Sequence, residues 1–291
     1  MPMSPRLLRP IASGVHPEAA AWRTAVVANG GTTPSATTMN AVSKFCKDID
    51  AAGIRSKFRR LNLFCGTSDA SLVAVRTPLY RGESRTGTQY GSDLDTNVNF
   101  VEGDYTETGA SGGLLGNGTS KYLNTGFNVS SLPGAANCHL SAYIRGTQDI
   151  ASARTLVGVL FNGVTDRYRL FLQLSGSSAP NYGIQTELGK ATAAGIVNRI
   201  NTNGGLILAS RTSTTSLTIY DDAVSVATVA TITAETTGAS PFFVFARNGP
   251  TEYYNGRMAG YSIGAGLSDA EATSYYSAMN TFQTALSRNQ A

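Results

Sequence analysis

The fold is decided near the end of the chain, where residues 241–288 are PFFVFARNGPTEYYNGRMAGYSIGAGLSDAEATSYYSAMNTFQTALSR. Two strand patterns come first, an apolar run at 241–248 and a run with small residues on one side at 256–264. Ser268 and Glu271 then have the spacing of a helix-capping box. Apolar residues follow every three to four positions, at Ala272, Tyr275, Met279, Phe282 and Leu286. This block predicts a closing helix packed against a sheet.

Upstream of this block, short strand patterns recur between turn residues. They cover residues 121–127, 138–145, 155–161, 168–174, 182–188, 206–211, 216–220 and 224–229. Regular short strands with glycine-rich turns between them predict a mainly β protein, either a sandwich or a jelly roll. Within 138–144 alternate residues are apolar, so His139 is expected on the outward face of its strand.

The front of the chain has a different character. Five prolines fall within residues 1–36, which predicts an extended docking arm because proline interrupts helices. Trp22, the only tryptophan, is placed to anchor this arm on a folded body. Residues 38–53 carry the clearest early helix pattern, with Gly53 where a C-terminal cap belongs.

Three further segments precede the β-rich part. Residues 61–65 and 71–75 are expected to be short strands, and residues 81–99 a long loop of the kind used for interactions. The expected organisation is therefore an arm over 1–36, a helix-containing entry segment over 37–97, and a β-sandwich with a closing helix over 98–291.

Two stretches resemble concanavalin-like (laminin-G-like) jelly-roll proteins encoded in the structural regions of bacteriophages. The matching residues are Ala246–Asn248, Asn255–Arg257, Leu267–Glu271, Phe282–Arg288 and, upstream, Leu115–Phe127. The resemblance spans residues 39 to 288 and implies a jelly-roll β-sandwich with a C-terminal helix and an N-terminal helix-containing segment. Asp221-Asp222 stands where the family usually has a hairpin Asn-Gly, so the type of that turn is left open.

The same resemblance implies a function. It is that of a non-enzymatic bacteriophage virion structural protein, namely a capsid decoration, minor capsid or tail-associated component made in the host bacterial cytoplasm. Such a protein acts by assembly on other phage virion proteins, as a symmetric homo-oligomer such as a trimer. The arm would order on neighbouring subunits, and multivalent contacts would offset the entropy of ordering it.

Positive charge is concentrated at the front of the chain. The net charge is +4, yet residues 1–60 hold nine Lys and Arg against three acidic residues. This asymmetry predicts docking onto an acidic partner surface, and a solvated helix face is the alternative. The candidate docking residues are Arg6, Arg9, Trp22, Arg55, Lys57, Arg59 and Arg60.

No pattern in the sequence predicts catalysis. Glycoside hydrolases on sandwich folds use paired carboxylates, whereas Glu187, Glu235 and Glu252 are isolated in this sequence. His16 lies in the proline-rich arm and His139 on a strand, and neither accompanies a nucleophile motif. We therefore expect no enzyme.

Metal, cofactor, nucleic-acid and membrane sites are not expected either. The alternating oxygen side chains of residues 93–99 lack the glycine and glutamate of a calcium loop. The basic run at 55–60 has no aromatic stacking platform for nucleic acid. No apolar run is long enough to span a membrane. Cys46, Cys65 and Cys138 are expected to be buried free thiols.

Glycan recognition is the alternative function. Aromatic and amide side chains on turns suit sugar stacking and hydrogen bonding, and the candidates are Tyr182, Tyr253, Tyr254 and Asn255. The chain would then be a receptor- or glycan-binding adhesin module of a phage tail or head fibre, with a host surface glycan as partner. Hairpin packing explains these aromatic clusters equally well.

Overall fold

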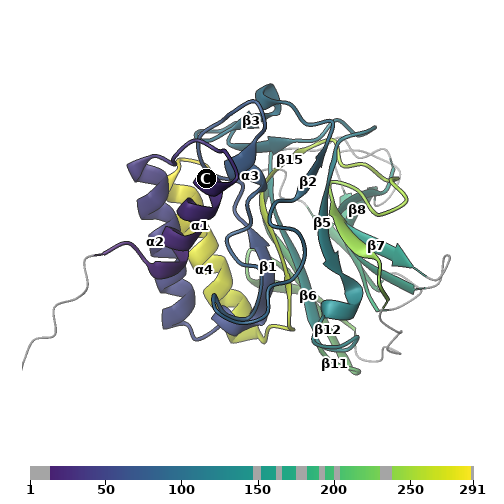
Figure 1. Cartoon of the computed structure of the whole chain (residues 1–291). Coiled ribbons are helices and arrows are strands. Elements are labelled where there is room, and N and C mark those ends of the chain that lie inside the picture. Colours follow the sequence, from purple (N-terminus) through teal and green to yellow (C-terminus); the bar gives the residue numbers. More distant parts are fainter. Residues whose placement is uncertain are drawn as a thin grey trace, which may run out of the picture.

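The structure is a computed structural model that describes residues 14–146, 152–161, 166–174, 182–189, 194–199, 204–229 and 238–289. Three layers are stacked on one another (Figure 1). Helices α1 (Pro17–Ala28), α2 (Ala36–Ala51) and α4 (Asp269–Ala285) form the first layer. A central sheet forms the second layer, and an outer sheet forms the third.

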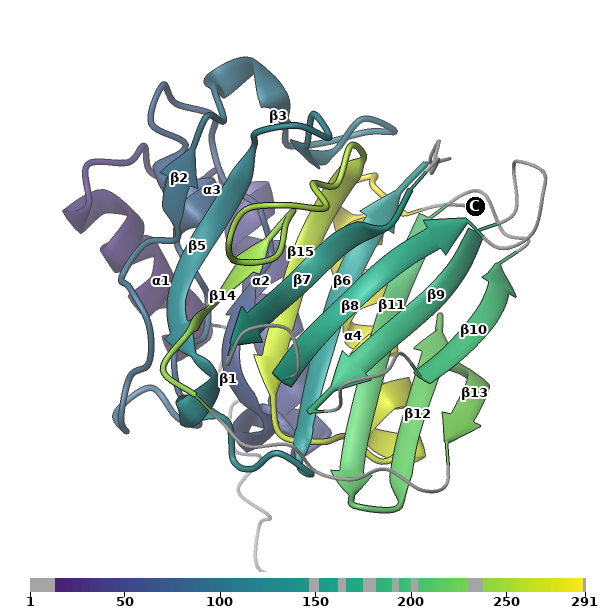
Figure 2. The same ribbon diagram turned by 90° about the vertical axis from the view of Figure 1, so that its right-hand side faces the viewer.

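Both sheets are antiparallel. Within the described residues the central sheet has eight strands, in the order β13 (Val224–Val229), β12 (Ser216–Asp221), β11 (Gly204–Ser213), β6 (Cys138–Arg145), β15 (Arg257–Gly264), β4 (Gly113–Leu115) and β3 (Tyr105–Thr106), with β1 (Phe58–Asn62) also on β15. The outer sheet has seven in the same part of the chain, in the order β10 (Ala194–Arg199), β9 (Tyr182–Leu188), β8 (Asp166–Leu174), β7 (Arg154–Phe161), β14 (Pro241–Val244), β5 (Tyr122–Asn128) and β2 (Thr96–Val98). Figure 2 shows this sheet in front of the helices.

Strand β6 shows how the layers are joined. Leu140 and Ala142 face the outer sheet and belong to the core between the two sheets. Tyr143 points the other way and belongs to the core under the helices. His139 also points away from the sandwich, as expected, but the helical layer covers it, so every residue of β6 is buried. The central sheet therefore has a core on each of its faces.

The closing helix is confirmed with its capping box. Ser268 Oγ accepts from the Glu271 amide at 3.4 Å, and Glu271 Oε2 accepts from the Ser268 amide at 2.8 Å. The apolar face of α4 is buried, and its Phe282 ring packs edge-on against Phe45 of α2 with centroids 6.1 Å apart. This contact joins the two longest helices of the layer.

Residues 14–36 differ from the expected extended arm, because they contain helix α1. The proline at position 17 occupies the first helical turn, where its missing N–H costs nothing, and His16 Nδ1 accepts from the Glu18 amide at 3.2 Å. Trp22 is buried, and its indole N–H donates to the Thr77 carbonyl at 3.0 Å. This part of the chain is therefore packed onto the body. Residues 1–13 lie outside the described residues.

The expected division at residue 97 runs through continuous structure. Strand β1 pairs with β15, so the entry segment contributes to the central sheet. The strand expected at 61–65 ends at Asn62, and the one expected at 71–75 is replaced by the short helix α3 (Val73–Arg76). Leu72 begins this helix in the left-handed region, at a φ of 53°, which a strand cannot accommodate.

The predictions for the cysteines are confirmed. All three are buried and free. Burial raises the pKa of the Cys46 thiol and of the Cys138 thiol to about 12, so both remain thiols at neutral pH. Among the helices of the described part of the chain, none is long and apolar enough to cross a membrane.

Candidate binding face on the outer sheet

Arg60 does not lie on the docking surface expected from the sequence. Its side chain has no exposed area, and its Nη2 lies 2.6 Å from Asp95 Oδ1. Tyr261 OH donates to Asp95, and Arg60 Nη1 and Nη2 donate to the carbonyls of Tyr90 and Ser92 at 3.1 Å. Burial disfavours the Arg60 cation, but the charge of Asp95 outweighs it and raises the pKa of Arg60 above its usual range. A fully buried guanidinium cannot reach a partner protein, so Arg60 is not a docking residue. Its hydrogen bonds instead hold the loop of residues 81–95 on the sheet.

The other described docking candidates also have internal partners. Arg55 Nε lies 2.9 Å from Glu18 Oε1, and its guanidinium lies over the Tyr80 ring. Lys57 Nζ lies 3.0 Å from Glu271 Oε1. Arg59 pairs with Glu83 and donates to Tyr90 OH at 2.5 Å. With Trp22 buried, these side chains link the entry segment to its neighbours. Arg6 and Arg9 lie outside the described residues.

The expected glycan-binding residues separate into three groups. Tyr254 is fully buried in the core between the sheets, so it leaves the candidate set. Tyr253 and Asn255 are half-buried, and Tyr253 reaches the outer face of the outer sheet, where its ring centroid lies 6.3 Å from that of Tyr122. The side chain of Tyr182, on β9, lies outside the described residues.

One row of outward-facing residues crosses the outer sheet from β5 to β9. The strand registers align Asn124 with Phe243, Phe243 with Gly158, Gly158 with Arg169, and Arg169 with Glu187. An amide, an aromatic ring, a cation and a carboxylate therefore lie side by side on this face. Phe243, Arg169 and Glu187 are buried, so the area open to solvent belongs to Asn124 and to residues beside the row. We call this surface the outer face.

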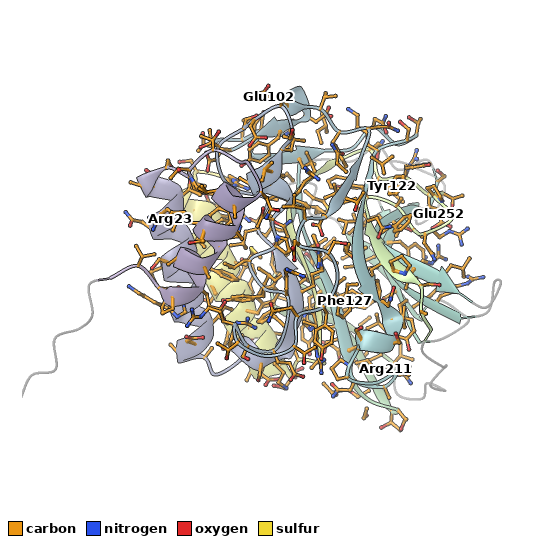
Figure 3. All side chains as sticks on the ribbon, in the orientation of Figure 1. Arg23, Glu102, Tyr122, Phe127, Arg211 and Glu252 are labelled. Atoms are coloured by element: carbon orange, nitrogen blue, oxygen red, sulfur yellow. The ribbon has the colours of Figure 1, made fainter. Side chains whose placement is uncertain are left out.

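The aromatic end of the outer face is a short ladder of rings. Tyr122 of β5 stacks on Phe243 of β14, with centroids 4.8 Å apart and planes 16° apart. Tyr253 lies beyond Tyr122. Tyr122 and Tyr253 are half-buried, so each presents part of its ring to solvent. Figure 3 shows Tyr122 close to Glu252 on the side of the molecule away from the helices.

The charged end of the outer face is an arginine–glutamate cluster. Arg169 pairs with Glu187 on the neighbouring strand and with Glu252 Oε2, the latter at 2.5 Å. Arg167 Nη1 lies 3.0 Å from Glu187 Oε1, and Arg247 Nε lies 3.3 Å from Glu252 Oε1. Burial disfavours the Arg169 cation, but its bonds to the two glutamates raise its pKa. Three arginines against two glutamates leave one positive charge.

Backbone geometry fixes Glu252 in this cluster. Its φ is 55°, in the left-handed region that non-glycine residues rarely adopt. Its carbonyl accepts from the Thr155 amide at 2.8 Å, and its Oε2 accepts from Thr155 Oγ1 at 2.8 Å. Strained residues held this firmly often mark functional positions. The absence of a side chain at Gly158 leaves room for Arg169. A Cβ added at position 158 would come 2.9 Å from the Arg169 Cβ, which is closer than two such atoms normally approach.

Glu187 and Glu252 are far apart in the sequence and were predicted to be isolated, but in the folded chain both pair with Arg169. One signal was available in the sequence, because Arg167 and Arg169 alternate with Tyr168 and Leu170 along β8, which marks one polar face. The strand register and the path of the loop that carries Glu252 were not readable from it.

The two histidines and the acidic residues do not add a second site. His139 Nε2 lies 2.8 Å from Ser262 Oγ, a distance suited to nucleophile activation, but both side chains are fully buried beneath the helices. Burial lowers the pKa of His139 to about 4, so it is neutral at pH 7. His16 pairs with Asp50 at 2.9 Å. No three His, Cys, Asp or Glu side chains gather as metal ligands in the described residues.

Comparison with known proteins identifies the architecture. No protein-family model and no curated protein matches this chain. Among solved structures, the receptor binding domain of botulinum neurotoxin C/D mosaic serotype aligns with a TM-score of 0.51 and 8% identity, over 77% of this chain and 52% of that chain.

Two further structures align at lower TM-scores. Trypanosoma rangeli sialidase aligns at 0.46 and 10% identity, over 82% of this chain and 39% of that chain. Domain 4 of AbnA, an arabinanase of Geobacillus stearothermophilus, aligns at 0.41 and 13% identity, over 56% of this chain and 75% of that chain. With its two antiparallel sheets, this chain is a jelly-roll β-sandwich with N-terminal helices and a closing C-terminal helix.

Proposed function

We propose that this protein is a glycan-binding module whose contact surface is the outer face. The observation that carries this proposal is the pair of half-buried rings of Tyr122 and Tyr253 beside Glu252, whose partly exposed carboxylate belongs to the arginine–glutamate cluster. Sugars present both apolar ring faces and many hydroxyls, so a site needs aromatic rings beside fixed donors and acceptors. The outer face has both, because the rings of Tyr122 and Tyr253 lie beside the carboxylate of Glu252.

The polar groups are fixed before a ligand arrives. Arg169 is held by two glutamates, and Glu252 by Thr155, so binding costs little side-chain entropy there. Fold analogy gives weaker support, because the neurotoxin domain of similar architecture is also a binding domain.

Binding without catalysis is part of the proposal. A glycosidase needs one carboxyl group as proton donor and a second as base or nucleophile. Here both glutamates accept hydrogen bonds from arginines, which cannot give up a proton near neutral pH, so the pair is arranged for electrostatic contact.

A glycan array followed by titration of the best ligand tests this proposal. Replacing Tyr253 by alanine should weaken binding about fivefold, because a stacked aromatic ring contributes roughly 1 kcal/mol beyond its buried area. Tyr276 of α4, half-buried on the helical layer, is the matched control, and Tyr276→Ala should leave the affinity unchanged. Equal loss in both variants, or no glycan bound at all, would refute the proposal.

We further propose that the module belongs to a bacteriophage virion, where it assembles with other virion proteins as a homo-oligomer. The support for this setting is the sequence resemblance of residues 246–288 and 115–127. Cryo-electron microscopy of purified particles tests it, because density for the three-layer fold should appear on the capsid or the tail. Particles that lack the chain by mass spectrometry would contradict it.

A further inference from the structure

A small hollow of about 160 Å³ lies between helix α1 and the 78–89 segment, on a different surface from the outer face. Trp22, Pro78 and Leu79 give it an apolar floor, and Arg81 and Arg85 stand at its polar side. The volume is well below the roughly 300 Å³ or more of typical small-molecule sites. The hollow is therefore suited to one side chain rather than to an oligosaccharide.

The arginines around the hollow differ in how they are engaged. Arg55 is fixed by Glu18, by the Gly82 carbonyl at 2.7 Å and by the Tyr80 ring, so it forms a rigid wall. Arg81 pairs with Asp93, but its buried Nε has no hydrogen-bond partner in the described part of the chain.

Arg85 supplies the free charge at this site. It is exposed, and its guanidinium has no hydrogen-bond or ion-pair partner among the described residues. Three arginines against Glu18 and Asp93 leave one positive charge at the hollow. The site thus offers unused N–H donors above an apolar floor.

We propose that this hollow receives the side chain of an aspartate or glutamate from an acidic segment of a partner protein. The carboxylate accepts from the exposed guanidinium of Arg85, and charge-assisted bonds of this kind are stronger than neutral ones. The methylene groups of the entering side chain lie on Pro78 and Leu79. This inference does not depend on glycan binding at the outer face.

The only tryptophan of the chain lines this hollow, so its indole N–H resonance reports on the hollow directly. The probe is a hexapeptide of alternating glycine and glutamate, with its glutamine counterpart as the uncharged control. The glutamate peptide should shift the indole resonance of the ¹⁵N-labelled full chain with a saturable dependence, and the glutamine peptide should not.

Arg85→Ala should weaken binding about three- to fivefold, the range for an exposed ion pair, without unfolding the chain. Arg23→Ala is the matched control, because Arg23 is an exposed arginine of α1 that does not line this hollow (Figure 3). An unmoved indole resonance, or equal weakening in both variants, would overturn the proposal. Saturation by free glucuronate at a lower concentration than by the peptide would also overturn it, since the hollow would then take a sugar acid.

Discussion

At the scale of single residues, the fold depends on charged and polar groups that have no access to water. Arg60 and Asp95 are both fully buried, and Tyr261 completes their hydrogen bonding. A buried ion pair of this kind is tolerated only when both partners are present, because an unpaired charge cannot be solvated. The pair joins strand β1 to the loop that precedes β2.

Asp95→Ala should therefore lower the free energy of unfolding by about 3–5 kcal/mol, since it leaves Arg60 buried and unpaired. Chemical denaturation in urea measures the change. The control is Asp48→Ala, which removes the half-buried partner of the exposed Lys44 on α2 and should cost at most about 0.5 kcal/mol. Similar losses in the two variants would show that the buried pair has no special role.

The lowered pKa of His139 leads us to expect that the stability of the fold depends on pH. Its pKa is about 4 in the folded state against 6.5 for the unperturbed side chain, because burial disfavours the cation. The unfolded chain then binds more protons between these values, so stability is complete above about pH 6.5 and falls as the pH drops towards 4. Protonation of His139 should lower the free energy of unfolding by about 3 kcal/mol over this pH range.

Thermal denaturation between pH 4 and 7 checks this expectation. His139→Gln should flatten the pH dependence in this range relative to the unchanged chain, whatever it does to absolute stability. A pH dependence that persists in His139→Gln would assign the effect to other groups.

At the scale of secondary-structure elements, local signals predicted the best-defined parts of the fold. The capping box fixed the start of α4, and strict alternation gave β6 its bounds. Short strands such as β3 and β4 carry too few residues for a periodic pattern, and neither was predicted. Strand β10 was not predicted either. The apolar run at 71–75 predicts a strand, but tertiary packing makes residues Val73–Arg76 helical.

The cap of α4 gives a prediction at this scale. Ser268→Ala removes the hydroxyl that accepts from the Glu271 amide, so it should lower the free energy of unfolding by about 1 kcal/mol. Ser277→Ala, at an exposed position within the same helix, is the control and should change stability by less than about 0.5 kcal/mol. Equal effects would mean that the capping box adds nothing to the folded state.

At the scale of the whole molecule, the central sheet is shared by two cores. Leu206, Leu208 and Tyr220 lie under the helices, while neighbouring residues of the same strands face the outer sheet. The sequence suggested a boundary at residue 97 because the series of strand patterns begins after it. A strand pattern does not say which strand it pairs with, so the pairing of β1 with β15 could not be predicted.

A fragment of residues 98–291 should therefore fail to fold as a soluble monomer, because it leaves the apolar face under α2 and β1 exposed. Size-exclusion chromatography and circular dichroism compare it with the full chain. A fragment of residues 14–291 is the control and should behave like the full chain. A monomeric, cooperatively folded 98–291 fragment would show that the sandwich is an independent domain.

The order of the strands has a kinetic consequence as well. β6 and β15 are flanked on both sides in their sheet and covered on both faces, whereas β13 and β10 each end a sheet in the described part of the chain. Amide protons exchange with solvent from edge strands through local opening, but from the innermost strands only when the entire molecule opens. Deuterium uptake should therefore begin at β13 and β10, advance strand by strand, and reach β6 last.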